Sequence, residues 1–258
     1  MTFINRIRMM IPQMLSRLWS YFVFLTSKKA RLTGQSPDGR EAALLNYVLS
    51  KAEEGNAEAV LAAIDDYTQS VWMMNIGKHK GSILESAVQR CEPKLALELG
   101  TYCGYSAIRI ASKMSKPDSK LISLEINPNN CNVAKAIINH AGLASKVDVM
   151  EGTLSDRLED LCDILDDEGV PHFDFLLMDH SKQCYLSDFL LLKERGMIGK
   201  GSIIVSNNVG SDFSNYLRTS SDELESEEHR CGSEYMSLLP SIITVSTFKA
   251  DLPMFVRT

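Results

Sequence analysis

Two glycines, Gly100 and Gly104, lie in the part of the chain that is best suited to bind a ligand. The apolar run at residues 95–99 leads into this glycine-bearing turn, and a second apolar run, at residues 121–124, ends in Glu125. Glycine lets the backbone approach a ligand closely, and a carboxylate at the tip of the next strand can accept hydrogen bonds from both ribose hydroxyls. These residues predict a binding site for an adenosine-bearing cofactor.

The spacing of the glycines narrows the choice of cofactor. The dinucleotide-binding fingerprint G-x-G-x-x-G requires glycine at the position of Tyr102, so a pyrophosphate ligand is disfavoured. Glu98, Gly100 and Gly104 instead follow the spacing E-x-G-x-x-x-G, which resembles the first motif of class I methyltransferases. The cofactor of those enzymes, S-adenosylmethionine, carries no phosphate. The alternative is a tight turn between strand and helix that binds no ligand.

Two later apolar runs also end in groups that can bind a cation or act as a base. The segment Asp-His-Ser-Lys occupies residues 179–182, and Asn207 and Asn208 follow the next run. A parallel sheet would place these strand ends side by side, and Mg²⁺ prefers oxygen ligands. The sequence therefore predicts a magnesium site formed by Asp179, Asn207 and Asn208. The alternative is structural, with Asp179 as a helix N-cap and the asparagines as a turn pair.

The spacing of apolar residues predicts an alternating order of helices and strands. Helical periodicity indicates three helices before the first strand, around residues 44–49, 59–64 and 83–88. Strands are predicted near residues 94–99, 120–125, 146–151, 173–179, 201–206, 241–248 and 253–257, and helices near 104–115, 128–141, 154–168, 183–195 and 212–220. Continuous apolar runs such as 173–178 suit strands that are covered on both faces. We therefore expect an α/β fold with a Rossmann-like, doubly wound, seven-stranded and mostly parallel sheet, an antiparallel edge hairpin, and helices on both faces.

Length, charge and cysteine content limit the classes of function. A chain of 258 residues, 45% hydrophobic and 23% charged, is typical of one large α/β domain with a short extension. The net charge of −6, with no basic stripe in the body of the chain, argues against nucleic acid as a partner. The six cysteines form no C-x-x-C pair, which predicts free thiols in a reducing, cytoplasmic compartment.

Residues 1–33 differ from the rest and are expected to form an extension ahead of a methyltransferase domain at residues 34–258. Basic residues interrupt aliphatic and aromatic ones, and Gln13 and Arg17 leave less than the roughly 20 apolar residues of a spanning helix. The pattern favours an interfacial helix, or a poor signal anchor, held at an anionic membrane surface. The alternative is a helix that frays or packs on the core. Residues 33–39 are expected to form a linker.

From about residue 40 to the end, the sequence closely resembles the catechol O-methyltransferase family. Five segments carry the resemblance: WMMNIG at 72–77, LELGTYCGYS at 97–106, EINP at 125–128, MDHSK at 178–182 and EY at 234–235. An ordered set of this kind is far more specific than any single motif. The resemblance implies Mg²⁺-dependent transfer of a methyl group from S-adenosylmethionine to a hydroxyl of a catechol-type, catecholamine-like small molecule.

The resemblance also implies which residues contact the cofactor. Glycine-turn residues would border its methionine part, Glu125 its ribose, and His180 its adenosine side, while the segment 74–76 would surround the sulfonium. The full set implied for the cofactor is Met74, Asn75, Ile76, Glu98, Gly100, Tyr102, Ser106, Glu125, Ile126, Asp179 and His180. Met74, like Trp72 before it, could instead be a core residue at the end of a helix.

For the acceptor, the resemblance implies that Asp179, Asn207 and Asn208 hold Mg²⁺ and that Lys182 removes the catechol proton. Glu234 would accept a hydrogen bond from the other hydroxyl. Taken alone, Lys182 could be an ordinary solvated lysine, and the acidic run at residues 223–228, before Glu234, is expected to be a solvated loop.

Three features depart from the family pattern. Asn207 stands where the family has aspartate, so the site has one negative charge less and should bind magnesium more weakly. Ser181 replaces a tryptophan that walls the catechol slot, and the loop 208–213 lacks the family's proline. Either the acceptor preference shifts away from a small, flat catechol, or the slot is wider and less selective. The same changes leave open a second interpretation, a catalytically weak methyltransferase-like protein with a binding or trafficking role at a membrane. The sequence does not indicate an oligomeric state.

Overall fold

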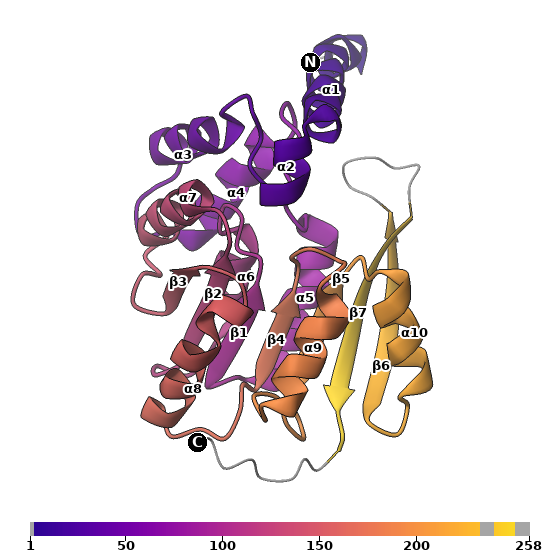
Figure 1. The fold of residues 1–258 in the computed structure, drawn as a ribbon. Helices are drawn as coiled ribbons and strands as arrows, with labels where there is room; N and C mark the ends of the chain where they lie inside the picture. Colours follow the sequence, from indigo (N-terminus) through magenta and orange to yellow (C-terminus); the bar gives the residue numbers. More distant parts are fainter. Residues whose placement is uncertain (1–2, 233–239, 251–258) are drawn as a thin grey trace.

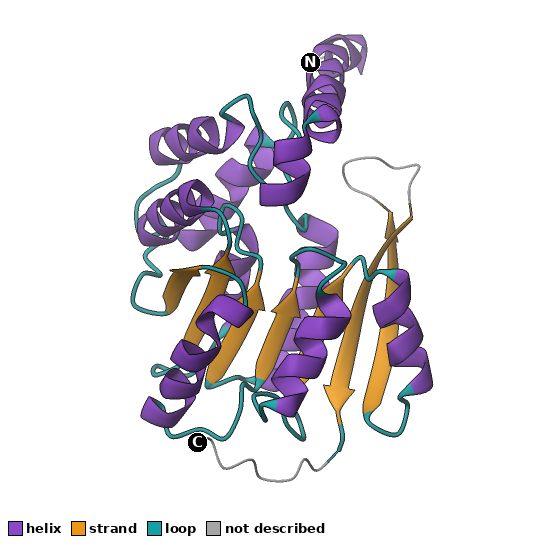
Figure 2. Ribbon diagram, viewed as in Figure 1, coloured by secondary structure: helices purple, strands orange, loops and turns teal. Residues whose placement is uncertain are grey.

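A seven-stranded sheet with the order β3-β2-β1-β4-β5-β7-β6 forms the centre of the molecule. The computed structural model describes residues 3–232 and 240–250 (Figures 1 and 2). The strands are β1 (Leu95–Leu99), β2 (Lys120–Glu125), β3 (Val147–Glu151), β4 (Phe175–Met178), β5 (Ile203–Asn207), β6 (Leu224–Gly232) and β7 (Pro240–Phe248). Neighbours among β1 to β5 pair in parallel, whereas β7 pairs antiparallel with both β5 and β6.

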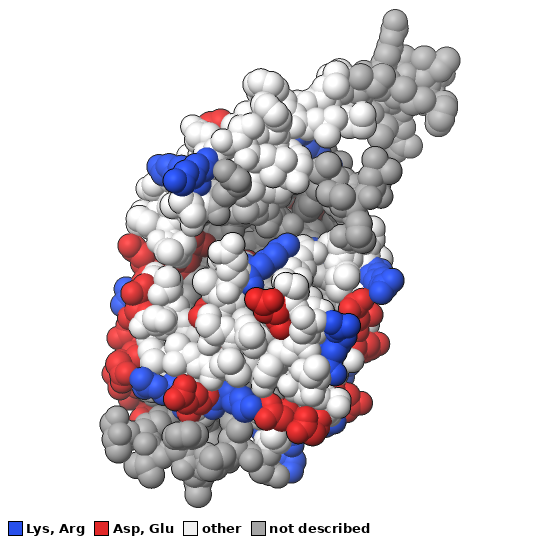
Figure 3. Space-filling model, turned by 45° about the vertical axis from the view of Figure 1, so that its right-hand side comes forward, with Lys and Arg blue, Asp and Glu red and all other residues white. Residues whose placement is uncertain are grey.

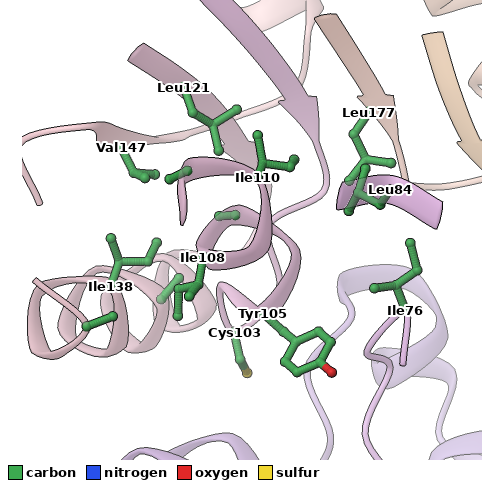
Figure 4. Packing of buried hydrophobic residues seen from close by; sticks show 14 of the residues in the cluster. Ile76, Leu84, Cys103, Tyr105, Ile108, Ile110, Leu121, Ile138, Val147 and Leu177 are labelled. Carbon is green, nitrogen blue, oxygen red and sulfur yellow. The ribbon is translucent and has the colours of Figure 1, made fainter. Parts of the chain in front are cut away.

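Each face of the sheet is covered by its own group of helices, so the fold is doubly wound. The helices on one face are α3 (Arg40–Lys51), α4 (Ala57–Tyr67), α5 (Lys78–Cys91), α6 (Tyr105–Lys113) and α7 (Pro128–His140). Figure 4 shows part of this core, where Leu121 and Val147 of the sheet face Ile110 and Ile138 of the helices. The other face is covered by α8 (Leu158–Asp167), which follows the 3-10 turn η1 (Ser155–Arg157), and by α9 (Tyr185–Glu194) and α10 (Ser211–Thr219).

The predicted alternation of strands and helices from residue 95 to residue 220 is confirmed, because local signals and burial agree there. Strand β4 is buried along its whole length, as its continuous apolar run requires of a central parallel strand. Helix α7 begins with Pro128 in its first turn, and the side chain of Asn127 caps it by accepting a hydrogen bond from the N–H of Asn129 at 2.9 Å. Strand β2 and helix α7 therefore meet at a sharp, well-defined turn.

The edge hairpin is present, but one of its two strands was assigned wrongly from the sequence. The predicted strand at 241–248 is confirmed as β7, whereas its partner is β6, which contains most of the acidic run 223–228 that we expected to be a loop. At the edge of a sheet, charged side chains can stay in water while the backbone pairs on one side. The other predicted strand, at 253–257, lies outside the described residues.

Two helices precede this domain, α1 (Phe3–Thr26) and α2 (Lys28–Thr33), and Figure 1 shows them beyond the carboxyl ends of the parallel strands. Pro12 lies within α1. Among the described residues, no helix is both long enough and apolar enough to cross a membrane. The two helices are joined to α3 by residues 34–39, the segment predicted to be a linker.

Candidate functional site

A cleft of about 1380 Å³ lies over the carboxyl ends of the parallel strands, where a doubly wound sheet binds its ligands. Single-ligand pockets typically have volumes of roughly 300–1,000 Å³, so this cleft has room for two ligands together. The turns that follow β1, β2, β4 and β5 line one side, and α1, α2 and the loop before α5 line the other. On the face shown in Figure 3, acidic and basic side chains lie close to one another along the lower part of the domain.

Gly100 begins the turn after β1 and allows it to press against the end of β4. The φ angle of Gly100 is +98°, and a Cβ there would lie 2.7 Å from the carbonyl oxygen of Asp179 and 3.0 Å from the amide nitrogen of His180. Both are backbone atoms, which cannot move aside as a flexible side chain could. The sequence predicts that Gly100 lets the backbone approach a ligand; in the structure the close approach is to the end of β4, and residues of both strand ends line the cleft.

Glu125, at the end of β2, is held by the same turn. The backbone N–H of Tyr102, whose φ is +50°, donates to one carboxylate oxygen at 2.7 Å, and the N–H of Asn127 donates to the other at 2.9 Å. Burial raises the pKa of Glu125, although these backbone hydrogen bonds oppose the shift. Each oxygen keeps a second lone pair, so the carboxylate is fixed at the edge of the cleft and can still accept hydrogen bonds from a ligand.

Glu98 lies below the turn rather than on the surface of the cleft. Its side chain is fully buried and accepts a hydrogen bond from the hydroxyl of Ser123 on β2. Burial raises the pKa of Glu98 to about 7, although the hydrogen bond from Ser123 favours the ionised form. The side chain therefore supports the turn from the core, and the predicted contact of Glu98 with the cofactor stays a prediction.

Met74, Asn75 and Ile76 lie in the loop between α4 and α5, and all three line the cleft opposite the glycine turn. The side-chain amide nitrogen of Asn75 is buried and has no hydrogen-bond partner among the described residues. Buried polar atoms are almost always paired, so an unpaired donor beside a cleft indicates a place where a ligand atom can bind.

His180 and Ile126 form another part of the cleft wall. The Nε2 atom of His180 lies 2.9 Å from a carboxylate oxygen of Asp188, and its ring stacks on Tyr185 with centroids 4.9 Å apart. The Nδ1 atom of His180 is buried and has no partner within the described ranges. Ile126 is 54% exposed, which is unusual for so large an apolar side chain at the edge of a cleft. A flat, partly polar ring would suit such a surface.

The polar tips of β4 and β5 are brought together, and a lysine from α5 joins them. The side-chain amide of Asn207 donates to Asp179 at 2.7 Å, and its oxygen accepts a hydrogen bond from the Nζ of Lys80 at 2.6 Å. Burial raises the pKa of Asp179 to about 6, although the hydrogen bond from Asn207 and the charge of Lys80 favour the ionised form. Lys80 is itself buried, so a cation is built into the place where we predicted a metal.

The three side chains predicted to hold magnesium do not fit that ion as they are arranged. The oxygen of Asn207 is bound to Lys80, and the oxygen of Asn208 accepts hydrogen bonds from the hydroxyl of Ser241 at 2.9 Å and the N–H of Ile242 at 3.2 Å. Only one carboxylate is present, and the described residues contain no group of three His, Cys, Asp or Glu side chains that could hold a metal. Magnesium binding therefore stays a prediction.

The remaining predicted residues fall in different places. Ser106, in the first turn of α6, is buried and lines the cleft beside Tyr102. Lys182 is exposed in the turn after β4 and also lines the cleft. Glu234 lies outside the described residues.

Sequence reasoning missed Lys80 and the aromatic residues of α1. Lys80 lies in the first turn of α5, 127 residues from its partner Asn207, and carries no local motif. Tyr21 and Phe24 line the cleft next to Trp72, but their segment was assigned to a separate extension. The i, i+3 spacing of Tyr21 and Phe24 on one helix face was the available signal.

Comparison with known proteins relates this architecture to a protein family. Residues 53–215 match a sequence model described as O-methyltransferase. A probable O-methyltransferase of Mycobacterium tuberculosis is 38% identical over 224 residues, which cover 84% of this chain and 95% of that protein. The catechol O-methyltransferase of Mus musculus is 36% identical over 208 residues, which cover 79% of this chain and 77% of that one. Among solved structures, an O-methyltransferase of Streptomyces achromogenes in complex with SAM has a TM-score of 0.62 at 18% identity, covering 84% of this chain and 100% of that chain.

Proposed function

Because the chain belongs to the O-methyltransferase family, we propose that it transfers a methyl group from S-adenosylmethionine to a hydroxyl of a catechol-type small molecule. The observation that carries the proposal is the placement of Glu125. Two backbone N–H groups fix its carboxylate at the edge of a cleft large enough for a cofactor and an acceptor together.

For the cofactor, the proposal assigns the ribose to Glu125 and the charged, sulfonium end to the loop 74–76. The unpaired amide nitrogen of Asn75 could donate to the carboxylate of the methionine part, and the ring of His180 supplies a flat surface for the adenosine side. The cleft places these groups around one continuous space. Because S-adenosylmethionine carries no phosphate, the cleft needs no phosphate-binding group.

For the acceptor, the proposal assigns the proton transfer to Lys182. A phenol has a pKa near 10 and is a weak nucleophile at neutral pH, so a base beside it raises the reactive fraction. Lys182 lies in the same turn as Asp179, and both line the cleft together with the loop 74–76. Methyl transfer then needs chiefly the alignment of oxygen, methyl carbon and sulfur, which a rigid cleft provides. The buried ammonium of Lys80 supplies positive charge near the forming phenolate.

Calorimetric titration with S-adenosylmethionine tests the cofactor half of the proposal. Hydrogen bonds to a charged group contribute about 1.5–3 kcal/mol, so Glu125→Gln should weaken binding by roughly tenfold to a hundredfold. Glu151→Gln is the matched control, because Glu151 ends the neighbouring strand β3 but does not line the cleft. An equal loss in both variants, or no binding by the wild type, would reject the assignment.

A methyl-transfer assay with catechol tests the acceptor half. We expect turnover by the wild type and a fall in kcat of about a hundredfold or more for Lys182→Ala, the usual contribution of a positioned base. Parallel reactions with EDTA and with added Mg²⁺ show whether the predicted metal contributes. No turnover above background under either condition would overturn the proposed reaction.

The second candidate function is binding or trafficking at a membrane, and one observation favours it. Helix α1 presents a row of exposed apolar side chains. They are Met14, Leu15, Leu18, Trp19, Phe22 and Leu25. Such a face beside basic residues can lie in the interface of an anionic bilayer. Co-sedimentation of the full chain with phosphatidylserine vesicles tests this function, with Trp19→Ser/Phe22→Ser as the matched variant. Equal partitioning of the two proteins would reject it.

A further inference from the structure

We infer that the N-terminal helix α1 is part of the acceptor pocket, where Tyr21 and Phe24 form, together with Trp72, an aromatic wall that selects the acceptor. The inference rests on the proposed methyl transfer and names residues that the catalytic assignment does not use. The sequence predicts a separate extension over residues 1–33, whereas Tyr21 and Phe24 of this segment line the cleft.

Helix α1 carries two aromatic pairs with the same spacing but opposite surroundings. Trp19 and Phe22 stack on each other at 5.8 Å and are 66% and 54% exposed. Tyr21 and Phe24 are half-buried, and their ring centroids lie 4.9 and 4.8 Å from that of Trp72. Both members of the second pair line the cleft, and neither member of the first does. One face of the helix is thus turned toward the site.

Hydrogen bonds fix the helix to the domain at this point. The N–H of Trp72 donates to the hydroxyl of Ser20 at 2.7 Å, and the carbonyl of Trp72 accepts a hydrogen bond from Arg40 at 2.7 Å. Arg40 also donates to the carbonyl of Ser20 at 2.6 Å and pairs with Asp38 at 2.6 Å. Ser20 and Arg40 are both buried. Because both backbone polar groups of Trp72 are paired, the three aromatic rings hold defined positions.

The aromatic wall and the residues assigned to the reacting end line the same cleft. Trp72 precedes Met74 by two residues in the loop assigned to the sulfonium, and Lys182 lines the same cleft from the turn after β4. That turn contributes the small residue Ser181 to the lining. Apolar area that the strand-end turns do not supply therefore comes from α1. Aromatic rings prefer tilted or offset partners at centroid distances of 4.5–7 Å, so the expected acceptor is a flat aromatic diol that carries a further apolar group.

Paired variants of the full chain test this inference. Tyr21→Ala/Phe24→Ala should raise the KM for a catechol with an aromatic substituent by about tenfold, which is about 1.4 kcal/mol. The value of kcat and the Kd for S-adenosylmethionine should change by less than about threefold, because the wall contacts only the acceptor. Trp19→Ala/Phe22→Ala, on the outer face of the same helix, should change none of these values. Equal KM values for the two variants would overturn the inference, as would parallel losses in cofactor affinity.

Fluorescence gives a readout that does not depend on turnover. The chain has two tryptophans, Trp19 and Trp72. With S-adenosylhomocysteine present, a catechol with an aromatic substituent should quench the fluorescence of Trp19→Phe, in which Trp72 is the remaining tryptophan. The same compound should leave the fluorescence of Trp72→Phe unchanged. Absence of quenching in Trp19→Phe would overturn the aromatic wall even if methyl transfer occurs. Quenching without methyl transfer would support the wall and reject the proposed reaction.

Discussion

Gly100→Ala is the substitution for which the structure makes the most specific prediction. The added Cβ would lie 2.7 Å from the carbonyl oxygen of Asp179, 2.9 Å from its carbonyl carbon and 3.0 Å from the amide nitrogen of His180. To relieve these contacts, the turn after β1 must move away from the end of β4. That movement would displace Tyr102, whose N–H holds Glu125. Stability and cofactor binding should therefore fall together.

Comparison with Gly201 separates the cost of the backbone conformation from the cost of the steric contacts at Gly100. Gly201 has a φ of +94°, close to the +98° of Gly100, but a Cβ at Gly201 would meet no atom within 4 Å. A left-handed conformation costs an L-residue about 1–2 kcal/mol, offset by about 0.4–1 kcal/mol because alanine restricts the unfolded chain. Gly201→Ala should thus cost roughly 1 kcal/mol. Overpacking adds about 1–3 kcal/mol, so Gly100→Ala should cost roughly 2–4 kcal/mol.

Urea denaturation of the two variants measures the free energies of unfolding, and calorimetry with S-adenosylmethionine measures the functional part. We expect the difference between Gly100→Ala and Gly201→Ala to be at least about 1 kcal/mol, with cofactor affinity lowered only in Gly100→Ala. Equal destabilisation would mean that the close approach to Asp179 is unimportant. Unchanged affinity in a clearly destabilised Gly100→Ala would mean that the turn does not hold the cofactor.

Two further predictions follow from buried charges. The pKa of Glu98 is about 7 in the folded protein and 4.5 for the ordinary group. Between these two pH values the native state therefore binds more protons than the unfolded state. The free energy of unfolding should fall as pH rises through this window, by at most about 1.4 kcal/mol per pH unit. Glu98→Gln should lose that slope in urea denaturation at pH 5 and 7, and parallel slopes for both proteins would contradict the assignment. Lys80→Met should raise the pKa of Asp179 above its present value of about 6, which NMR titration of that carboxyl would measure. The Asn207 oxygen left unpaired by the same substitution should cost about 1–3 kcal/mol of stability. Lys78→Met, which removes a 69% exposed lysine on the same helix, should leave the pKa of Asp179 unchanged.

The sequence predicted the parallel part of the fold well because its signals are local. A strand buried on both faces must be apolar throughout, and β4 is. The N-cap Asn127 and the following proline likewise mark the start of α7 in the sequence itself. Strand β6 could not be recognised in this way, because its pairing with β7 leaves most of its side chains in water and its composition looks like a loop.

The candidate site was predictable where one segment supplies both the turn and its chemistry. The spacing of Gly100 and Glu125 alone predicts a glycine turn and a carboxylate at a strand end, and both residues line the cleft. Lys80 is different, because nothing near it in the chain indicates that it meets Asn207. The magnesium site was predicted from the side-chain oxygens at the strand ends. The sequence does not indicate that Lys80 donates to the oxygen of Asn207 and that the N–H of Ile242 donates to the oxygen of Asn208.

The boundary expected at residue 33 separates two parts of the sequence, but residues on both sides of it line the cleft. The carboxylate of Glu41, at the start of α3, accepts hydrogen bonds from the N–H of Ser36 at 3.0 Å and from the hydroxyl of Tyr102 at 2.9 Å. Tyr102 in turn donates its N–H to Glu125. The segment that leads from α2 into α3 is therefore linked to the carboxylate assigned to the cofactor ribose, while Ser20 is linked to the aromatic wall. Because both ligand positions depend on residues before α4, removal of α1 alone should weaken acceptor binding, whereas loss of Ser36 and Glu41 as well should also weaken binding of S-adenosylmethionine.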